Sequence, residues 1–506
     1  MAYKHGAYGE ITASKVKSAT TTDTAVVYVG TAPVNLIRGY ATAGILNTPI
    51  KISNMIDAQN KVGYSDDWGS FSLCEAFAEH FDNTVGNVGP IYIINVLDPA
   101  THCKTDDTTV SVAFSDGRGE FLSSSIILDT LEIAVPNAGS GEDDEGDDTY
   151  EEGVDYEVSY DFNSGKVIIK SLNPDAQLTG DVTVSFKEID MTKVTTAHII
   201  GQRSATGAYS GLAAIDLLYQ KENVVANIIA APGWSQIPAV YTAMISAASK
   251  INGHWDAFVV ADIPLTDDGT AVDTIAKALA WKSTNGYTSE FSKVCWPKVK
   301  DGNGREFHLS TVTAATMQRI DAEHDGVPFE SPSNKQIMAT CQFFGSGSPN
   351  MGYDQQTANE LNEKGITTAV YWGGQWVLWG PHTAAYSYGG NTEARAIFDV
   401  SIRVLMHITN GFQLRNGTRI DEPMDSNLKD AIINSEQEIL DGYASMGALL
   451  GAPEVLFVES ENPEGNLVNG EFVWHINATP TAPFKSGTAR VTYTDEGFAA
   501  YFGGEA

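Results

Sequence analysis

The segment Leu361–Thr383, LNEKGITTAVYWGGQWVLWGPHT, carries a strong β-hairpin signal. Two runs rich in aromatic and β-branched residues, Thr368–Trp372 and Trp376–Trp379, flank the pair Gly373-Gly374. Glycine adopts positive φ angles at little cost, so this pair suits a tight turn between two strands. A hairpin this apolar needs cover and would be marginal as an isolated two-stranded sheet. The chain therefore has to supply further strands.

Two later segments are candidates for those strands: Gly470–Asn477 (GEFVWHIN) and Thr488–Asp495 (TARVTYTD). Both alternate apolar and polar residues, as half-buried strands do. We expect the hairpin sheet to be completed between molecules, by a strand that one copy lends to another. An open strand edge would offer main-chain hydrogen bonds to such a strand.

The whole chain is long and acidic. Its 506 residues are too many for one core, so about three or four domains are expected. An apolar fraction of 42% is ordinary for a globular protein, while 64 acidic against 31 basic residues give a net charge of −33. Nucleic acids and anionic membranes would be repelled by this charge. The same charge makes copies of the chain repel one another, and any assembly must overcome that repulsion.

The four cysteines, Cys74, Cys103, Cys295 and Cys341, lie far apart without a CxxC pair. We expect reduced thiols and neither a zinc site nor a disulfide framework. The opening MAYKHGAYGE is too polar for a signal peptide, and no apolar run approaches ~18 residues. We therefore expect synthesis in the cytoplasm and no membrane-spanning segment.

The first half of the chain predicts an α/β domain preceded by an arm. Residues 1–22 are small, polar and turn-rich, so they predict either a disordered tail or a strand that becomes ordered on a neighbour. A strand begins at Ala25, a helix is expected over Phe71–Phe81, and another strand over Gly89–Leu97. This order predicts an α/β layer, assigned to residues 23–100 and 196–345.

Two buried-type strands, Val224–Ala231 and Trp255–Asp262, with a helix between them, predict a βαβ unit and a parallel sheet. Further helices are expected over Val272–Thr284 and Thr311–Asp325. Residues 344–353 read as a linker by composition.

Residues 101–195 differ in composition from the α/β parts that surround them. Short strands at even spacing predict an inserted β-sandwich or barrel. Within this insertion, Glu142–Glu152 (EDDEGDDTYEE) holds eight acids in eleven residues. The ligand order of an EF-hand Ca²⁺ loop is absent, so a solvated loop is the preferred interpretation.

Residues 355–506 are predicted as a C-terminal domain. A helix over Thr392–Asn410 is expected to end at Gly411, and a second helix spans Ser426–Leu450. Strands follow at Val455–Val458 and in the two segments named above. The fold class predicted for the chain is thus multidomain, α/β and α+β.

No motif for catalysis is present. The sequence lacks a GxxxxGK[ST] loop, an HExxH pair and a GxSxG elbow. Asp216 and Asp262, at element ends, could act as bases, but many α/β proteins carry such residues without using them. We therefore expect no catalytic residue, no cofactor and no metal site.

A series of short motifs occurs in a fixed order along nearly the whole chain: Gly6–Glu10 (GAYGE), Tyr28–Pro33 (YVGTAP), Asn47–Ile50 (NTPI), Ala231–Gly233 (APG), Trp296-Pro297, Arg319–Asp321 (RID), Gly326-Val327, Ser331–Asn334 (SPSN), Leu361-Asn362 and Leu378–Thr383 (LWGPHT). In this order they resemble the contractile tail sheath proteins of bacteriophages and related contractile particles. The chain departs from the family pattern where Pro381-His382 stands for Ala-Arg and Ser333 for Ala.

The resemblance implies a subtilisin-like central domain without the protease triad, an insertion that faces outward and a C-terminal domain that faces an inner tube. It also implies hexameric rings stacked in a helical lattice in the virion tail. The implied partners are further copies of the chain, the tail tube protein, and baseplate and tail terminator proteins, with no direct contact to nucleic acid and no membrane insertion.

In such an assembly, the lent arms and the strands that receive them would form the contacts between copies. The residues predicted for these inter-subunit strands are Tyr8, Ile11, Val16, Tyr371, Trp376, Leu378, Phe472, Trp474, Ile476, Val491 and Tyr493. Two other functions stay open on the sequence alone: a hydrolase on a subtilisin-like scaffold, and a surface-layer or adhesin protein.

Overall fold

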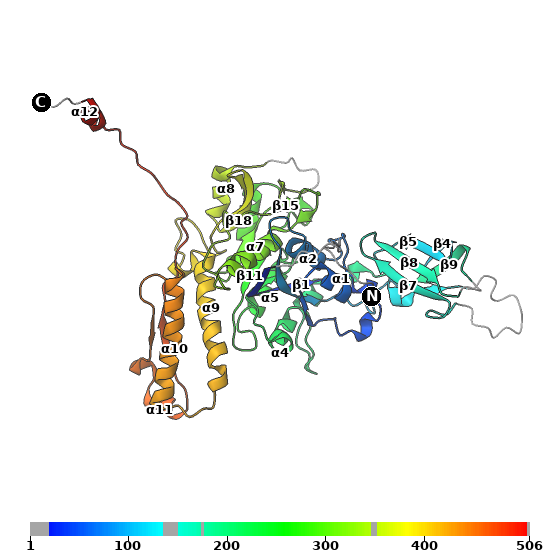
Figure 1. Ribbon diagram of the computed structural model, residues 1–506, viewed down its shortest axis with the longest axis horizontal. Helices are drawn as coiled ribbons and strands as arrows, with labels where there is room; N and C mark the ends of the chain where they lie inside the picture. The colour runs from blue at the N-terminus through cyan, green and yellow to red at the C-terminus, as the bar shows by residue number, and fades with distance from the viewer. Residues whose placement is uncertain (1–19, 135–149, 174–176, 346–351, 503–506) are drawn as a thin grey trace, which may run out of the picture.

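The computed structural model describes residues 20–134, 150–173, 177–345 and 352–502. A central body of helices and sheet lies between two projecting parts (Figure 1). An antiparallel sheet projects at one end of the long axis, and a helical pair with the C-terminal segment projects at the other. Three predicted site residues (Tyr8, Ile11, Val16), most of the acidic loop and most of the predicted linker lie outside the described residues.

The central body is built on one eight-stranded sheet. Its six inner strands are parallel, and an antiparallel strand lies at each edge. In spatial order the strands are β19 (Gln375–Trp379), β18 (Ile366–Trp372), β14 (Ser292–Cys295), β11 (Phe258–Asp262), β10 (Ile228–Ala230), β1 (Thr20–Gly30), β3 (Val88–Asn95) and β2 (Pro49–Ile52).

Helices cover both faces of this sheet. Four consecutive residues of β1, Val26–Val29, are fully buried, and successive side chains of a strand point to opposite faces. The predicted helix over Phe71–Phe81 and the parallel βαβ unit are confirmed as α2 and β10–α5–β11. The helices of the body are α1 (Met55–Lys61), α2 (Leu73–Phe81), α3 (Thr196–Ile200), α4 (Leu218–Glu222), α5 (Pro238–Ala247), α6 (Ile275–Thr284), α7 (Leu309–Glu323) and α8 (Gln355–Asn362).

Shorter elements complete the connections. Three more strands form a small sheet in the order β16 (Glu306–Phe307), β15 (Lys298–Lys300) and β17 (Cys341–Phe343), and β12 (Thr266–Asp267) pairs with β13 (Thr270–Ala271). The 3₁₀ helices are η1 (Val34–Leu36), η2 (Tyr40–Thr42), η3 (Leu128–Thr130), η4 (Met191–Lys193), η5 (Gly211–Leu217), η6 (Ala394–Ala396), η7 (Gly417–Arg419) and η8 (Glu459–Glu461).

The predicted hairpin is confirmed, but its place in the fold differs from the expectation. Gly373 and Gly374 form the turn with φ angles of 61° and 87°. Strand β18 pairs in parallel with β14, so the hairpin is the last part of the central sheet and not the start of a separate sheet in 355–506.

The sequence predicts an open outer edge on β19, but in the structure this edge is covered. Asn334 N–H donates to the Leu378 carbonyl (2.6 Å), Leu378 N–H donates to the Lys335 carbonyl (3.1 Å), and Ile337 N–H donates to the Trp376 carbonyl (3.0 Å). The segment 334–337 therefore satisfies the edge of the hairpin from within the same chain.

The insertion is a single antiparallel sheet and not the predicted sandwich. Its strands alternate buried and exposed residues, so only one face contributes to a core, which residues 126–133 close. No pairing between β6 and β7 closes a barrel in the described part of this sheet. In spatial order the strands are β6 (Glu132–Ile133), β9 (Gly180–Phe186), β4 (Thr108–Ser115), β5 (Arg118–Leu122), β8 (Lys166–Ser171) and β7 (Tyr156–Asp161).

The C-terminal part begins with two long helices, α9 (Asp399–Asn416) and α10 (Ser426–Ser445), which project from the body (Figure 1). The predicted end of the first helix at Gly411 is wrong, because α9 continues through this glycine for five more residues, to Asn416. A Cβ atom at Gly411 would lie 2.5 Å from Nη1 of Arg415. The glycine thus makes room for a guanidinium on the next turn and does not end the helix.

The elements after α10 are β20 (Glu454–Leu456), α11 (Glu464–Val468), β21 (His475–Asn477) and α12 (Glu496–Phe502). β20 and β21 pair antiparallel in a two-stranded sheet. The predicted strand over Thr488–Asp495 does not form within this chain.

His80, on α2, is a buried neutral histidine in the middle of the body. Its Nδ1 lies 3.2 Å from the Val88 carbonyl, to which it donates, and its Nε2 accepts a hydrogen bond from the Tyr28 hydroxyl (2.8 Å). Burial lowers the pKa of His80 to about 4, and burial likewise lowers the pKa of His382 and of His407 to about 4.

These three histidines predict a loss of stability in mild acid. Below an unfolded pKa of ~6.5 the unfolded chain takes up protons that the folded chain does not, so stability falls as pH drops from ~6.5 toward 4. Each histidine should lower the free energy of unfolding by roughly 1 kcal/mol at pH 5.5 relative to pH 7.5. Urea unfolding at the two pH values measures the loss, and His80→Gln should lose less than the wild type. Burial raises the pKa of Glu79 to about 8, so Glu79 adds stability over the same interval and opposes the histidines. An equal change in stability for the wild type and His80→Gln would contradict the assignment.

Candidate functional site

The candidate site lies in the C-terminal part of the chain. It consists of the β20–β21 sheet, carried by α9 and α10, and of residues 482–502, which we call the C-terminal arm. In Figure 1 the arm leaves the body as an extended segment and ends in α12. The description below starts from the anchor of α9 and proceeds outward.

Two buried ion pairs fix the first half of α9 to the body. Lys293 Nζ on β14 lies 2.6 Å from Asp399 Oδ2 at the start of α9, and both side chains are fully buried. One turn later, Arg403 pairs with Asp321 of α7, which also accepts a hydrogen bond from the Thr24 hydroxyl (3.0 Å). Removing one partner of such a pair would leave a buried charge without compensation. The anchor therefore fixes the direction in which α9 projects.

The second half of α9 is clamped to α10. Arg415 donates from Nε and Nη2 to the two carboxylate oxygens of Glu436, at 3.1 and 2.5 Å. Asn416 donates to the same carboxylate (2.8 Å), and His407 Nε2 lies 3.1 Å from the Tyr443 hydroxyl. Fork-shaped guanidinium–carboxylate contacts are geometrically specific. Together these bonds hold the two helices as one rigid support.

Side chains supply hydrogen bonds on the inner side of the β20–β21 sheet. Val455 N–H of β20 donates to Gln437 Oε1 on α10 (3.0 Å), so it points away from β21. Beyond the end of β20, Asn462 replaces a strand: its amide accepts from Val473 N–H (2.8 Å) and donates to the Val473 carbonyl (2.9 Å). An asparagine side chain thus extends the pairing of β21 toward its N-terminal end.

The opposite edge of β21 is free. Since Val455 and Ile476 form the pair that exchanges no hydrogen bonds, the N–H and C=O of Ile476 point outward. Phe472 and Trp474 have the same orientation because side chains and main-chain groups alternate along an extended chain. Within the described residues, no hydrogen bond uses the main chain of these three residues. The result is a strand edge with an unsatisfied row of donors and acceptors.

The side chains of this edge form part of a small core. Phe472, Trp474 and Ile476 are half-buried, and the ring of Trp474 lies 5.9 Å from that of Phe412 and 5.8 Å from that of Phe457. The indole N–H of Trp474 is buried and has no acceptor in the described part of the chain. An unsatisfied buried donor is costly, so this position favours an acceptor supplied from outside the subunit.

The C-terminal arm has no sheet of its own. It is held at its root, where Thr481 N–H donates to the Ala448 carbonyl (3.0 Å) and Lys485 Nζ lies 3.5 Å from the Tyr386 hydroxyl. Beyond the root, Val491 is 92% exposed and Tyr493 is 80% exposed. In the described residues no main-chain hydrogen bond joins residues 482–493 to the body. An apolar, extended segment of this kind is stable only on another surface.

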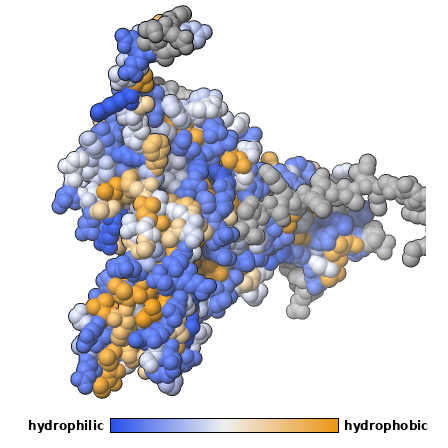
Figure 2. Space-filling view, turned by 60° about the vertical axis from the view of Figure 1, so that its left-hand side comes forward, coloured by the Kyte–Doolittle hydropathy of each residue, from blue (hydrophilic) through white to orange (hydrophobic). Residues whose placement is uncertain are grey.

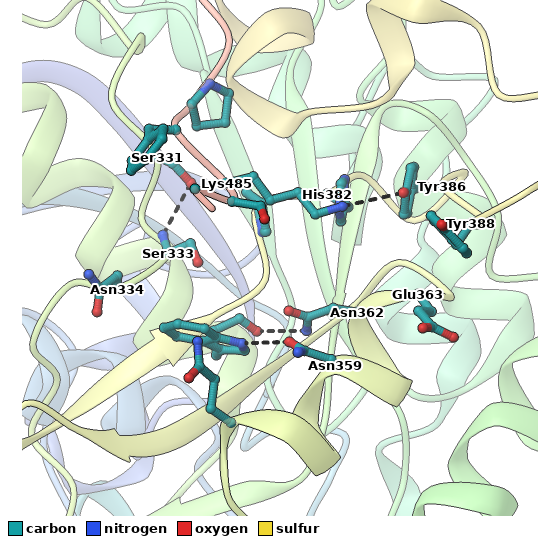
Figure 3. Close-up of a pocket in the computed structure, with 17 residues that line it drawn as sticks. Ser331, Ser333, Asn334, Asn359, Asn362, Glu363, His382, Tyr386, Tyr388 and Lys485 are labelled. Carbon is teal, nitrogen blue, oxygen red and sulfur yellow. Dashed lines mark hydrogen bonds between the residues drawn. The ribbon is translucent and has the colours of Figure 1, made fainter. Parts of the chain in front are cut away.

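A pocket of about 490 Å³ lies under the arm root. Its walls come from residues 331–334 after α7, from α8, from the residues after the hairpin and from the arm root itself, as Figure 3 shows. Here the ring of His382 stacks on that of Tyr386 at 3.5 Å, and Asn362 donates to the carbonyl of Trp379 (3.0 Å). The pocket thus seats the arm root on the edge of the central sheet.

Exposed apolar side chains gather on one face of the α9–α10 part (Figure 2). Among the exposed apolar side chains of this part of the chain, Val468 is 81% exposed, Ile420 73%, and Val473 on the free-edge segment 43%. Contiguous exposed apolar surface on a soluble protein indicates an interaction site. This face and the free edge of β21 belong to the same structural unit.

The predicted inter-subunit residues are distributed over three places. Tyr371, Trp376 and Leu378 lie in the hairpin, where Leu378 is fully buried and Tyr371 is 60% exposed. Phe472, Trp474 and Ile476 lie on the free edge, and Val491 and Tyr493 lie on the arm. One copy therefore does not bring the hairpin, the C-terminal strand segment and the arm together into one sheet.

Some residues of the site were not predicted from the sequence. Gln437 and Asn462 complete the inner side of the small sheet, and α12 ends the arm. Asn462 precedes a proline outside any strand pattern, so only its position in space shows its role. The basic residues of α9 that hold the support were also not identified, because ion pairs between distant segments leave no local pattern.

The two aspartates considered as bases have structural partners. Asp262 is buried and accepts hydrogen bonds from Ser310 N–H (2.9 Å) and from the hydroxyl of Ser235 (3.3 Å). Asp216 accepts from Asn252 N–H (3.0 Å). Burial raises the pKa of Asp262. Both carboxylates tie loops to strand or helix ends.

None of the four cysteines forms a disulfide. Across the residues that the structure describes, no group of three histidine, cysteine, aspartate or glutamate side chains is placed to hold a metal ion. In the same residues, no helix has the length and apolar character needed to cross a membrane.

Curated relatives of the chain carry the names tail sheath protein and major tail sheath protein. The tail sheath protein of Burkholderia phage BcepMu is 28% identical over 493 residues, which cover 92% of this chain and 94% of the relative. No protein-family model matches the chain.

Solved structures show the same fold. A chain of the anti-feeding prophage baseplate, determined by cryo-EM with 6-fold symmetry, covers 98% of this chain and 100% of its own length, with a TM-score of 0.54 and 14% identity. A chain of the contracted PVC sheath complex, an extracellular contractile injection system, covers 98% and 99%, with a TM-score of 0.54 and 11% identity.

The buried pair of Arg403 and Asp321 predicts a large cost of truncation. Arg403→Met leaves the Asp321 carboxylate buried without its partner and should lower the free energy of unfolding by about 3–5 kcal/mol. Arg395→Met is the matched control, since Arg395 pairs with Glu290 near the same helix but is 52% exposed. The control substitution should lower the free energy of unfolding by less than about 1 kcal/mol. Chemical denaturation measures both, and equal costs would show that α9 is not anchored by this pair.

Proposed function

Because the chain is a homologue of curated tail sheath proteins, we propose that it is the structural subunit of a contractile tail sheath. In this proposal it polymerises as stacked hexameric rings around a tail tube and contracts to drive the tube through the host envelope. The role is structural and not enzymatic. Homology supports the coarse assignment, and the free edge and the arm support the mode of assembly.

The observation that supports strand exchange is that the described chain carries both a free strand edge and an arm without a sheet. Among the described residues, each copy has a strand edge without a partner at Phe472, Trp474 and Ile476, and an extended arm without a sheet. The arm of one copy can satisfy the edge of another through main-chain hydrogen bonds. A contact between two different surfaces does not close into a dimer and instead propagates as a ring or helix. The N-terminal residues 1–22 would serve a second neighbour in the same way.

Exchange of this kind can supply enough free energy to oppose repulsion between copies. If a lent strand removes on the order of 400 Å² of apolar surface from water, the gain is roughly 10 kcal/mol before the ordering cost of the arm. Because the body does not hold the arm in the free subunit, ordering the arm on binding offsets part of this gain. The subunits would then stay joined while their bodies move.

Contraction follows as a rigid-body rearrangement of joined subunits, from a metastable extended lattice to a better packed one. The rigid support formed by α9 and α10 keeps the receiving edge fixed to the body, since the buried pairs of Asp399 and Arg403 hold it. Residues 486–493 of the arm, which no main-chain hydrogen bond joins to the body among the described residues, would be the flexible connection.

The finer assignments are proposals as well. They comprise a subtilisin-like domain in residues 23–100 and 196–345, an outward-facing insertion in 101–195, and a tube-facing C-terminal domain in 355–506 that carries the exchanged strand. The six parallel inner strands suit the first assignment. The proposed partners are the tube, baseplate and tail terminator proteins, and the proposed place is the virion tail after synthesis in the host cytoplasm.

Truncation of either arm tests the mode of assembly. A chain without residues 1–20 and a chain ending at Thr481 should both remain folded, since the described core contacts lie outside these segments, but neither should polymerise. Circular dichroism and thermal unfolding check the fold, and negative-stain electron microscopy of concentrated protein checks the polymer. Striated tubes from either truncated chain would refute strand exchange.

A proline on the free edge tests where the arm binds. Ile476→Pro removes an N–H that has no partner in the free subunit but also trims a half-buried side chain of the small core, so stability should fall by about 1–2 kcal/mol while assembly is lost. His475→Pro is the matched control, because that residue pairs with Leu456 of β20 and its loss should destabilise the C-terminal part. Unfolding curves and light scattering measure both effects. Normal assembly of Ile476→Pro would exclude this edge as the acceptor.

A further inference from the structure

The first part of the arm, residues 482–494, is opposite in charge to the surface around the free edge, and Asp495 and Glu496 follow it at the start of α12. Residues 482–494 contain one lysine, one arginine and no acidic residue, within a chain of net charge −33. Residues 450–480, which carry β20 and β21, contain five glutamates and no lysine or arginine. We call these five the acidic rim: Glu454, Glu459, Glu461, Glu464 and Glu471.

The two basic residues of the arm have different surroundings. Lys485 lies at the root, where its Nζ is 5.3 Å from the centre of the Tyr386 ring. Arg490 lies in the exposed middle of the arm and makes no ion pair with any described residue. Within the acidic rim, Glu461 lies 3.0 Å from His475, and the structure shows no basic partner for Glu471 among the described residues. The arm thus carries a cation without an ion pair, and the rim carries carboxylates, Glu471 among them, that have no basic partner within the described residues.

The alternation of side chains places these groups on the same side of an added strand. On the free edge, Phe472, Trp474 and Ile476 point inward, so Glu471, Val473 and His475 lie on the exposed face. On the arm, Val491 and Tyr493 share one face and Arg490 lies on the other. If the apolar face of the arm packs next to the indole of Trp474, Arg490 comes to lie on the exposed face that carries Glu471.

We infer that Arg490 recognises the acidic rim of a second copy, so that the arm is guided to the free edge by local charge attraction against the general repulsion between copies. This inference rests on the proposed strand exchange and adds the chemistry of recognition to it. The occupant of the edge is residues 488–494 of another copy. A carbonyl of that strand is also a suitable acceptor for the buried indole N–H of Trp474.

Salt screens both the general repulsion between copies and the local attraction of Arg490 to the acidic rim. The salt dependence of wild-type assembly therefore does not distinguish these two effects. Charge reversal does separate them. Arg490→Glu should raise the concentration needed for polymerisation at least about threefold, and Glu471→Lys should also raise it. The double variant R490E/E471K restores an opposite pair and should polymerise more readily than either single variant.

Lys187→Glu is the matched control, since it changes the net charge by the same amount on the inserted sheet, far from the arm. Sedimentation and light scattering of the full chain measure polymerisation, with thermal unfolding as a check of the fold. Equal effects of R490E and K187E, or failure of E471K to rescue R490E, would overturn the inference. The chain ending at Thr481 separates the two hypotheses: if it does not polymerise, strand exchange stands whichever way the charge variants behave.

Discussion

A strand edge buried in an assembly must have its main-chain groups hydrogen-bonded, and this constraint organises the C-terminal part of the molecule. Gln437 and Asn462 satisfy the inner side of the small sheet, whereas nothing in the described chain satisfies the outer side at Ile476. The same chain extends an arm that has no sheet. In the proposed exchange, the arm of one copy completes the free edge of another.

The rest of the fold keeps that edge in a fixed place. Antiparallel strands β19 and β2 form the edges of the eight-stranded sheet, and the segment 334–337 covers β19, so the hairpin offers no competing edge. Asp399 and Arg403 anchor α9 in the body, and Arg415 joins α9 to α10. A rigid body, a rigid support and one free edge are what a subunit needs if it is to move without losing its neighbours.

Local patterns in the sequence predicted the local elements well. The apolar stripe of α2, the parallel βαβ unit around α5 and the glycine turn of the hairpin are present as expected. The predictions that were wrong failed because contacts between distant segments decide the structure there. Gly411 lies inside α9 because Arg415 needs its space, and the hairpin edge is covered by a polar segment, SNKQI, that has no strand pattern. The insertion forms one sheet because residues 126–133 close its core, which spacing alone does not show.

The site was predicted in part. Phe472, Trp474 and Ile476 were identified from their alternation, and they form the free edge, whereas Leu378 is buried inside the body. The central claim concerns a contact between copies, so a cryo-EM map of the assembled polymer tests it most directly. The account predicts density for residues 488–494 of one subunit along β21 of its neighbour, hydrogen-bonded at Ile476. Arms folded back onto their own β21, or a neighbour's edge left empty in the polymer, would contradict it.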